Sequence, residues 1–168
     1  MKKRTISILL VMLMIFGIAT PAMAISPRAT IQLNPESHVS PITTTIIDGE
    51  EVEVSVATAS VAVAGAGRAN WNARGYTTVT RPLIGNLRAT ATTRTDVPVQ
   101  FIGAMVTLNT GATVVRSPFY VNVNTILVRS REVTGGARTG VGHGNHEFTA
   151  TMSSSSIEWR SMNTSFNN

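Results

Sequence analysis

Residues 87–95, Leu-Arg-Ala-Thr-Ala-Thr-Thr-Arg-Thr, decide the fold class of this chain. In its first part apolar residues occupy every second position, at Leu87, Ala89 and Ala91, and alternate with Arg88, Thr90 and Thr92. Successive side chains of an extended strand point to opposite faces. The stretch is therefore predicted to be a β-strand with one face toward a core and the other toward water.

The sequence from Ile42 onward has a composition that also favours strands. Threonine and valine dominate, glycine and proline recur at short intervals, and no segment keeps a helical period. β-Branched residues fit a pleated, half-buried surface. We therefore predict an all-β fold, an antiparallel β-sandwich or barrel of about eight or nine short strands. The predicted strands span residues 42–47, 51–64, 76–81, 87–95, 99–108, 113–116, 119–128, 146–152 and 157–162.

Finer features follow from the same alternation. Asp48-Gly49 is a good hairpin turn. In the strand over 51–64 the valines change parity, which predicts a bulge near residues 58–60 or a bend into another sheet. In the strand over 119–128, Phe119, Val121 and Val123 are expected to point inward.

The N-terminus has the plan of a secretory signal peptide. Lys2, Lys3 and Arg4 precede an apolar run over 6–18, and Ala22-Met23-Ala24 offers small residues for cleavage. The run is shorter than the roughly 20 residues that a membrane-spanning helix needs. We expect residues 1–24 to be removed, and no transmembrane segment in the mature chain.

After residue 24 we expect an extended arm over 25–41, which is acidic and contains proline, and one β-sandwich domain over 42–168. The chain has no cysteine. An exported domain without disulfides is held by packing and hydrogen bonds, and is common in Gram-positive bacteria.

Charge is unevenly distributed along the chain. The mature part holds eleven arginines against nine acidic residues, a net charge of +2, which is no strong argument for nucleic acid binding. Residues 25–53 carry a net charge of −4 and residues 54–168 a net charge of +6. The acidic segment is either a solvated arm or an arm that docks on the arginines.

Arginines recur every six or seven residues in the middle of the chain, with aromatic residues among them. Guanidinium groups bind carboxylate and phosphate in two-point fashion and stack on aromatic rings. The alternative is that they form the solvated face of the strands. The candidate binding face comprises Arg68, Trp71, Arg74, Tyr76, Arg81, Arg88 and Arg94.

The segment over 99–108 is apolar on both parities. Such a strand is either covered on both sides or meets a partner with its outer face. The candidate interface residues are Phe101, Ile102, Met105 and Val106.

One cluster of histidine and carboxylate offers weak candidates for metal binding, namely His143, His146 and Glu147. Zinc proteases place two histidines one helical turn apart. Here the segment is rich in glycine, and a strand would send His146 and Glu147 to opposite faces. We therefore expect a structural role, no metal, no cofactor and no catalytic residue.

The segment Pro98-x-x-x-Ile102-Gly103-Ala104, followed by Leu108, Gly111, Val114-x-x-Ser117 and Asn122, resembles a pattern in small secreted proteins of Gram-positive bacteria. The likeness covers about residues 75–150. No catalytic residue comes with it.

These observations predict a secreted, non-enzymatic protein that binds or assembles at or near the bacterial cell envelope. The expected partner is an anionic envelope polymer or other copies of the chain. The alternative is a secreted toxin or antimicrobial whose basic β-body is masked by the acidic N-terminal segment. A metal-dependent hydrolase is a third, weaker alternative.

Overall fold

A computed structural model describes residues 30–64, 69–111, 113–153 and 156–167. Within these ranges the chain forms β-strands and no helix, so the predicted all-β class is confirmed. It follows that the described residues include no apolar helix of membrane-spanning length. The predicted signal peptide over 1–24, the start of the predicted arm and Arg68 lie outside the described residues.

The described ranges contain eleven strands, where about eight or nine were predicted. Three short strands, over 30–32, 37–39 and 133–134, were not predicted from the sequence. The predicted strands over 87–95 and 99–108 form a single strand of 22 residues, Arg88–Asn109. The strands are β1 (Thr30–Gln32), β2 (Ser37–Val39), β3 (Thr43–Ile47), β4 (Glu50–Val63), β5 (Trp71–Pro82), β6 (Arg88–Asn109), β7 (Val114–Arg116), β8 (Tyr120–Arg129), β9 (Val133–Thr134), β10 (Val141–Ser153) and β11 (Ser156–Asn167).

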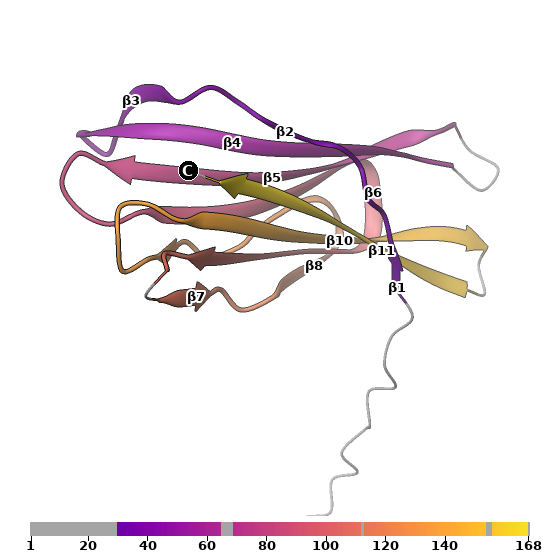
Figure 1. The fold of residues 1–168 in the computed structure, drawn as a ribbon. Coiled ribbons are helices and arrows are strands. Elements are labelled where there is room, and N and C mark those ends of the chain that lie inside the picture. Colours follow the sequence, from indigo (N-terminus) through magenta and orange to yellow (C-terminus); the bar gives the residue numbers. More distant parts are fainter. Residues whose placement is uncertain (1–29, 65–68, 112, 154–155, 168) are drawn as a thin grey trace, which may run out of the picture.

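All eleven strands belong to one sheet, which curls into a half-barrel (Figure 1). The strand order is β1-β11-β10-β6-β5-β4-β2, with β3 beside β4, and with β7, β8 and β9 beside β6. Every pair is antiparallel except β1 with β11. The predicted arm over 25–41 thus contributes two strands, β1 and β2, to the margins of the sheet.

The bend in β6 makes the sheet curl. Its first half pairs with β5 up to Thr95, and its second half pairs with β10 from Ile102. Against β8 the register shifts between Arg94 and Val99. Pro98 lies in this gap, where its missing N–H breaks no ladder bond, so the strand continues through a proline.

The two arms of the curled sheet enclose the core. On one arm β4 and β5 lie across from β10 and β11 on the other, with Trp71 of β5 meeting Phe148 of β10 edge to face at a centroid distance of 5.8 Å. The inward parity of β6 changes at the bend, from Ala89 and Ala91 to Ile102 and Ala104. The fully buried side chains include Leu87, Ile102, Val106, Leu108, Phe148 and Met162.

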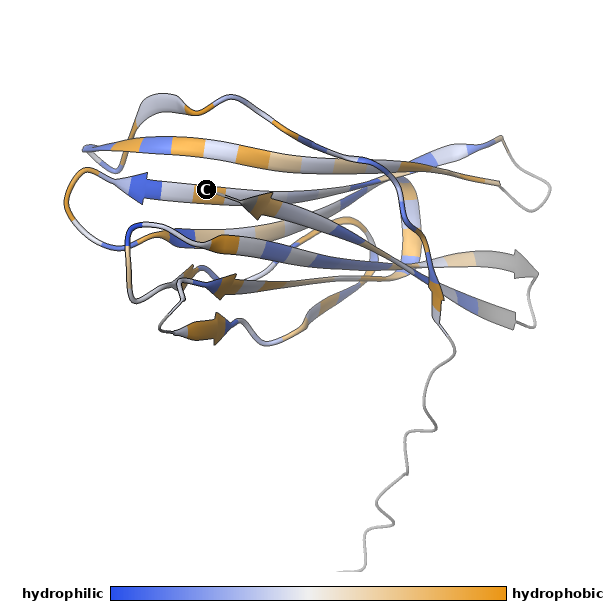
Figure 2. Cartoon of the chain, viewed as in Figure 1, coloured by the Kyte–Doolittle hydropathy of each residue, from blue (hydrophilic) through white to orange (hydrophobic). Residues whose placement is uncertain are grey.

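Strand β4 differs from its predicted form. Its register with β5 is unbroken from Val52 to Val63, so the bulge predicted near residues 58–60 is wrong. The positions buried toward the facing arm are small, at Ser55, Ala57 and Ala59. Residues of higher and lower hydropathy alternate along β4 (Figure 2). In the middle of the strand small residues face inward because the opposite arm is close, whereas Val63 fills the core at the end of the strand.

Strand β8 is also exposed where burial was predicted. Val121 and Val123 are 43% and 59% exposed. Among the described strands β8 pairs only with β6, so no second element covers these valines.

Candidate anion-binding face

The outward side of β5 and of the first half of β6 is a polar face, which we call the outer face. Alternation sends Gly75, Thr77 and Val79 of β5 into the core, so Arg74, Tyr76, Thr78 and Thr80 point outward. On β6 the outward positions carry Arg88, Thr92 and Arg94. The outer face therefore combines arginine, threonine and one tyrosine.

Register places Arg74 directly opposite Arg94. Directly opposite residues of antiparallel strands have Cβ atoms about 4.5–5.5 Å apart, and like charges at this separation destabilise the pair. Arg74 is neutralised, because its Nη1 lies 3.0 Å from Oδ1 of Asp96. Arg94 has no such partner among the described residues.

Asp96 has no free oxygen to offer Arg94. Its Oδ2 accepts hydrogen bonds from the Nδ2 and the backbone N–H of Asn72, at 3.0 and 3.1 Å, while its Oδ1 accepts from Arg74. The bonds from Asn72, and after them the charge of Arg74, lower the pKa of Asp96 below its usual value. Asp96 is thus a fixed negative charge that is already satisfied.

Arg129 of β8 joins Arg94 on this face. It pairs with Thr92, and Leu127 pairs with Arg94, so the two arginines are diagonal neighbours on adjacent strands, roughly 7–8 Å apart. Within the described ranges neither forms an ion pair. Of the three arginines Arg74, Arg94 and Arg129, only Arg74 therefore has a carboxylate partner among the described residues.

A polar hollow of about 230 Å³ adjoins this cluster. Its lining includes Thr78, Thr80, Thr90, Arg88, Arg129 and Glu132, together with the apolar residues Ile47, Val52 and Ala89. Arg88 also approaches Glu50, with 3.6 Å between Nη2 and Oε2. Both charge signs and several hydroxyls line the hollow, which suits a polar, hydroxyl-rich ligand.

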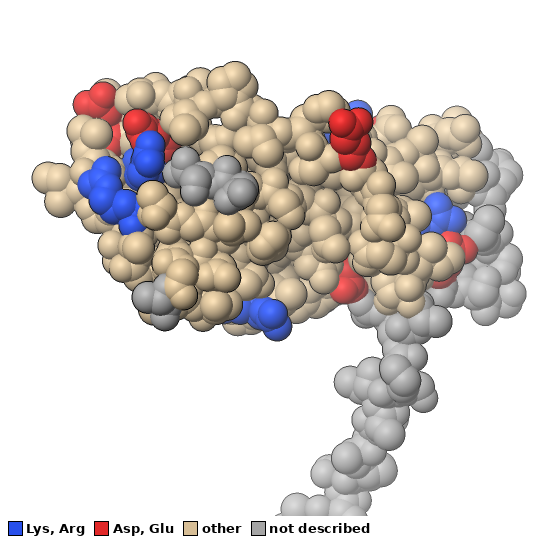
Figure 3. All heavy atoms as spheres, in the orientation of Figure 1, with Lys and Arg blue, Asp and Glu red and all other residues tan. Residues whose placement is uncertain are grey.

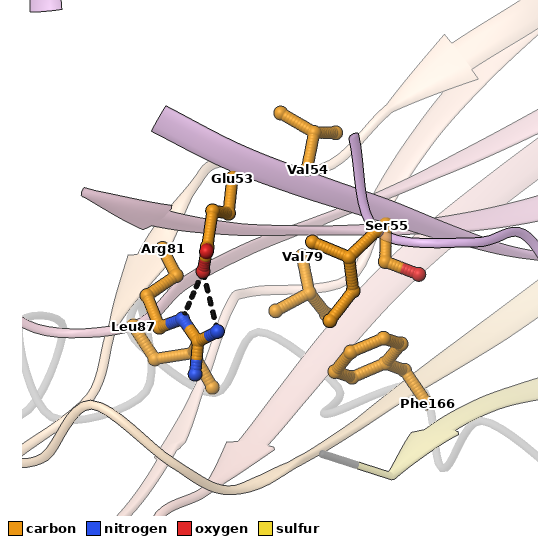
Figure 4. Close-up of a pocket in the computed structure, with 8 residues that line it drawn as sticks. Glu53, Val54, Ser55, Val79, Arg81, Leu87 and Phe166 are labelled. Atoms are coloured by element: carbon orange, nitrogen blue, oxygen red, sulfur yellow. Dashed lines mark hydrogen bonds and ion pairs between the residues drawn. The ribbon is translucent and has the colours of Figure 1, made fainter. Parts of the chain in front are cut away.

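Not every arginine of the predicted face lies there. Trp71 packs against Phe148 and the core. Arg81 lies beside Leu87 and Phe166, where its Nε and Nη2 both contact Oε2 of Glu53 (Figure 4). The space at this point is about 10 Å³, room for one water molecule at most.

The acidic N-terminal segment does contact arginines, through Glu53 with Arg81 and Glu50 with Arg88. Basic and acidic side chains lie against one another at the end of the molecule that holds the β3–β4 turn (Figure 3). These acids belong to β4, which is an integral strand of the sheet.

The candidate interface over 99–108 is divided by the strand alternation. Ile102 and Val106 are fully buried in the core, so they are not part of an exposed surface. Phe101 and Met105 are half-buried on the other side. There the ring of Phe101 stacks on Trp159 at a centroid distance of 5.4 Å, and Phe119 covers Gly103. The strand is thus covered mainly by its own chain.

The three metal candidates do not converge. His146 is fully buried, whereas His143 is exposed, with its Nδ1 2.9 Å from the hydroxyl of Ser165. His143 and Glu147 are four residues apart in an extended strand, roughly 13 Å. In the described part of the chain no group of three His, Cys, Asp or Glu residues is placed to hold a metal ion.

His146 instead belongs to a buried hydrogen-bond network. Its Nδ1 lies 3.0 Å from Oγ1 of Thr93, and its Nε2 lies 2.8 Å from Oγ1 of Thr164. Thr93 donates its own proton to the carbonyl of Gly103, so Nδ1 carries the imidazole proton and Nε2 accepts from Thr164. Burial lowers the pKa of His146 to about 3, which keeps the ring neutral.

Arg129 is the residue that sequence reasoning missed. It lies outside the segment in which the arginines recur, and only the pairing of β8 with β6 brings it beside Arg94. The predicted parity of the strand over 119–128 would have pointed Arg129 inward, so the sequence held no signal for this residue.

Comparison of the chain with protein-family models, with curated proteins and with solved structures finds no match.

Proposed function

We propose that the chain is a secreted, non-enzymatic protein whose outer face binds an anionic polymer of the bacterial cell envelope. The observation that carries the proposal is the cluster of Arg74, Arg94 and Arg129, in which only Arg74 has a carboxylate partner among the described residues, Asp96. Two arginines directly opposite each other cost stability. A phosphate or carboxylate between them would remove that cost.

The ligand class follows from the groups around the cluster. Arginine forks favour phosphate or carboxylate. The threonines and the mixed charges of the neighbouring hollow favour sugar or polyol hydroxyls. A repeating polymer that carries both kinds of group would contact the cluster and the hollow together.

Titration calorimetry with polygalacturonate and with polyphosphate, and with neutral dextran as a blank, tests the proposal. We expect binding of an anionic polymer that weakens as salt is added. The double variant Arg94→Gln/Arg129→Gln should lose about tenfold or more in affinity, because a charged hydrogen bond contributes about 1.5–3 kcal/mol.

The matched control is Arg116→Gln/Arg131→Gln, which removes the same charge elsewhere, since Arg116 bonds Thr107 on β6 and Arg131 lies over Tyr120. Equal losses in both double variants would mean that only net charge matters, and would contradict the site. Fractionation of the producing cells should recover the chain with the cell wall, and release it with salt.

A further inference from the structure

Strand β3 presents an unpaired edge that lacks the usual protection. Among the described strands β3 pairs only with β4. All five of its residues are exposed, and Ile46 is 72% exposed. Proteins commonly blunt such edges with lysine, proline, a bulge or an inward charge, and none of these lies within residues 43–47, Thr-Thr-Thr-Ile-Ile.

The hairpin turn determines which backbone groups are free. Asp48 and Gly49 have φ values of 52° and 81° and join Ile47 to Glu50 directly. In such a two-residue hairpin the flanking residues form a hydrogen-bonded pair, and bonded positions then alternate along the strand. Thr43, Thr45 and Ile47 therefore bond to β4. The N–H and C=O groups of Thr44 and Ile46 point away from the sheet.

The other long edge is a poorer template. In β8, Asn124 has a φ of 50°. Two residues earlier, Asn122 donates its side-chain amide to the carbonyl of Leu127 at 3.5 Å. This kink, and the register shift against β6, break the line of backbone groups. A straight strand can therefore add to β3 but not to β8.

We propose that β3 pairs with β3 of a second copy of this chain, antiparallel, with Thr45 on the two-fold axis. In this register Thr44 faces Ile46 of the second copy and Ile46 faces its Thr44, so the four free backbone groups of each edge are satisfied. The same surface is used on both copies, and the assembly closes as a dimer.

Charge and side chains are compatible with a second copy. All five residues are uncharged and β-branched, so no like charges lie opposite each other across the new pair. The acidic residues Glu51 and Glu53 lie on β4. The two β4 strands would be three strand spacings apart, roughly 14 Å, which exceeds the screening length of about 8 Å at physiological salt.

This geometry predicts a salt dependence opposite to that of anion binding. At low ionic strength the two acidic β4 strands repel each other, so added salt should strengthen the dimer. Failure of the dimer and failure of the proposed polymer binding are thereby distinguishable.

The test uses the purified chain. Because the chain has no cysteine of its own, an introduced thiol can form a disulfide only with the same thiol of a second copy. In Thr45→Cys the two thiols would face each other across the axis at a non-bonded position, where the Cα atoms are about 4.5 Å apart, within disulfide range. We expect rapid oxidation to a covalent dimer. The control, Ile84→Cys, places an equally accessible thiol at a residue that is 88% exposed, and should oxidise slowly.

Sedimentation velocity supplies the second measurement. The unmodified chain should sediment as a concentration-dependent dimer, and Ile46→Lys or Thr44→Pro should make it monomeric with an unchanged circular-dichroism spectrum, while Ile84→Lys stays dimeric. A monomeric unmodified chain, or a dimer that survives Ile46→Lys and does not crosslink at position 45, would overturn the proposal.

Discussion

The imidazole ring of His146 on β10 lies directly against the backbone of Gly75 on β5. A Cβ atom on Gly75 would come within 2.6 Å of Cγ and 2.8 Å of Nε2 of the ring. The two residues belong to opposite arms of the curled sheet, and their contact determines how closely the arms approach.

Gly75→Ala should destabilise the fold severely, because the methyl group meets a ring that is fully buried and held by two hydrogen bonds. Overpacking a core costs typically about 1–3 kcal/mol and can cost more. Urea unfolding followed by circular dichroism measures the loss. Gly142→Ala is the milder control, since its Cβ would meet Val79 Cγ2 at 3.1 Å and, at ordinary contact distance, Thr77 Cγ2 at 3.6 Å and Phe166 Cβ at 4.0 Å. In a His146→Ala background the extra cost of Gly75→Ala should shrink, and equal costs in both backgrounds would contradict the contact.

The chain should lose stability in acid through His146. Its pKa falls from 6.5 to about 3 on folding, so the unfolded state binds a proton that the folded state refuses. Stability is then complete above pH 6.5 and declines as the pH drops toward 3, by up to about 1.4 kcal/mol for each unit. Unfolding free energies measured across this window check the slope. His146→Gln should flatten it, whereas His143→Gln, at an exposed residue, should leave it unchanged.

Thr164→Val should cost about 1–3 kcal/mol. The variant removes the donor to Nε2 of His146 and the hydroxyl that contacts Thr77, and leaves buried polar atoms unsatisfied. Thr164→Ser keeps the hydroxyl and should retain most of the stability. If Thr164→Val loses no more stability than Thr164→Ser, the hydrogen bonds of this hydroxyl make no measurable contribution and the network is contradicted.

Asp96→Asn should strengthen anion binding on the outer face. The change removes the carboxylate that neutralises Arg74, so that none of the three guanidinium groups keeps a carboxylate partner among the described residues. Calorimetry with the polymer that binds best should show a several-fold lower Kd, most clearly at low salt. Glu158→Gln, which removes an acid that is paired with Arg160 on β11, is the control and should leave the Kd unchanged.

Much of the local structure was predictable from the alternation of residues. The pattern over 87–95 gave the correct inward set, Leu87, Ala89 and Ala91, and Asp48-Gly49 is the turn expected from its residue types. The outward parity of Arg88 and Arg94 was predicted for the same reason. These features depend on residues within one strand or one turn.

Errors arose where burial depends on a distant strand. Val121 and Val123 have an inward pattern, yet no element covers them. The change of valine parity along β4 suggested a bulge near residues 58–60, yet the register is unbroken and Ser55, Ala57 and Ala59 face inward, where β10 and β11 lie close. The alternation of residues along a strand predicts which side chains share a face. It does not predict which of the two faces another strand covers.

By itself the sequence determined the class of structure, the positions of the turns and the residues that share each strand face, because side-chain direction in a strand alternates locally. Only the tertiary structure decided that β6 bends between Arg94 and Val99, that His146 rests on Gly75, and that Arg129 joins Arg94. These relationships join residues far apart in the chain, and they exist only once the register of each pair of strands is set by packing between the two arms.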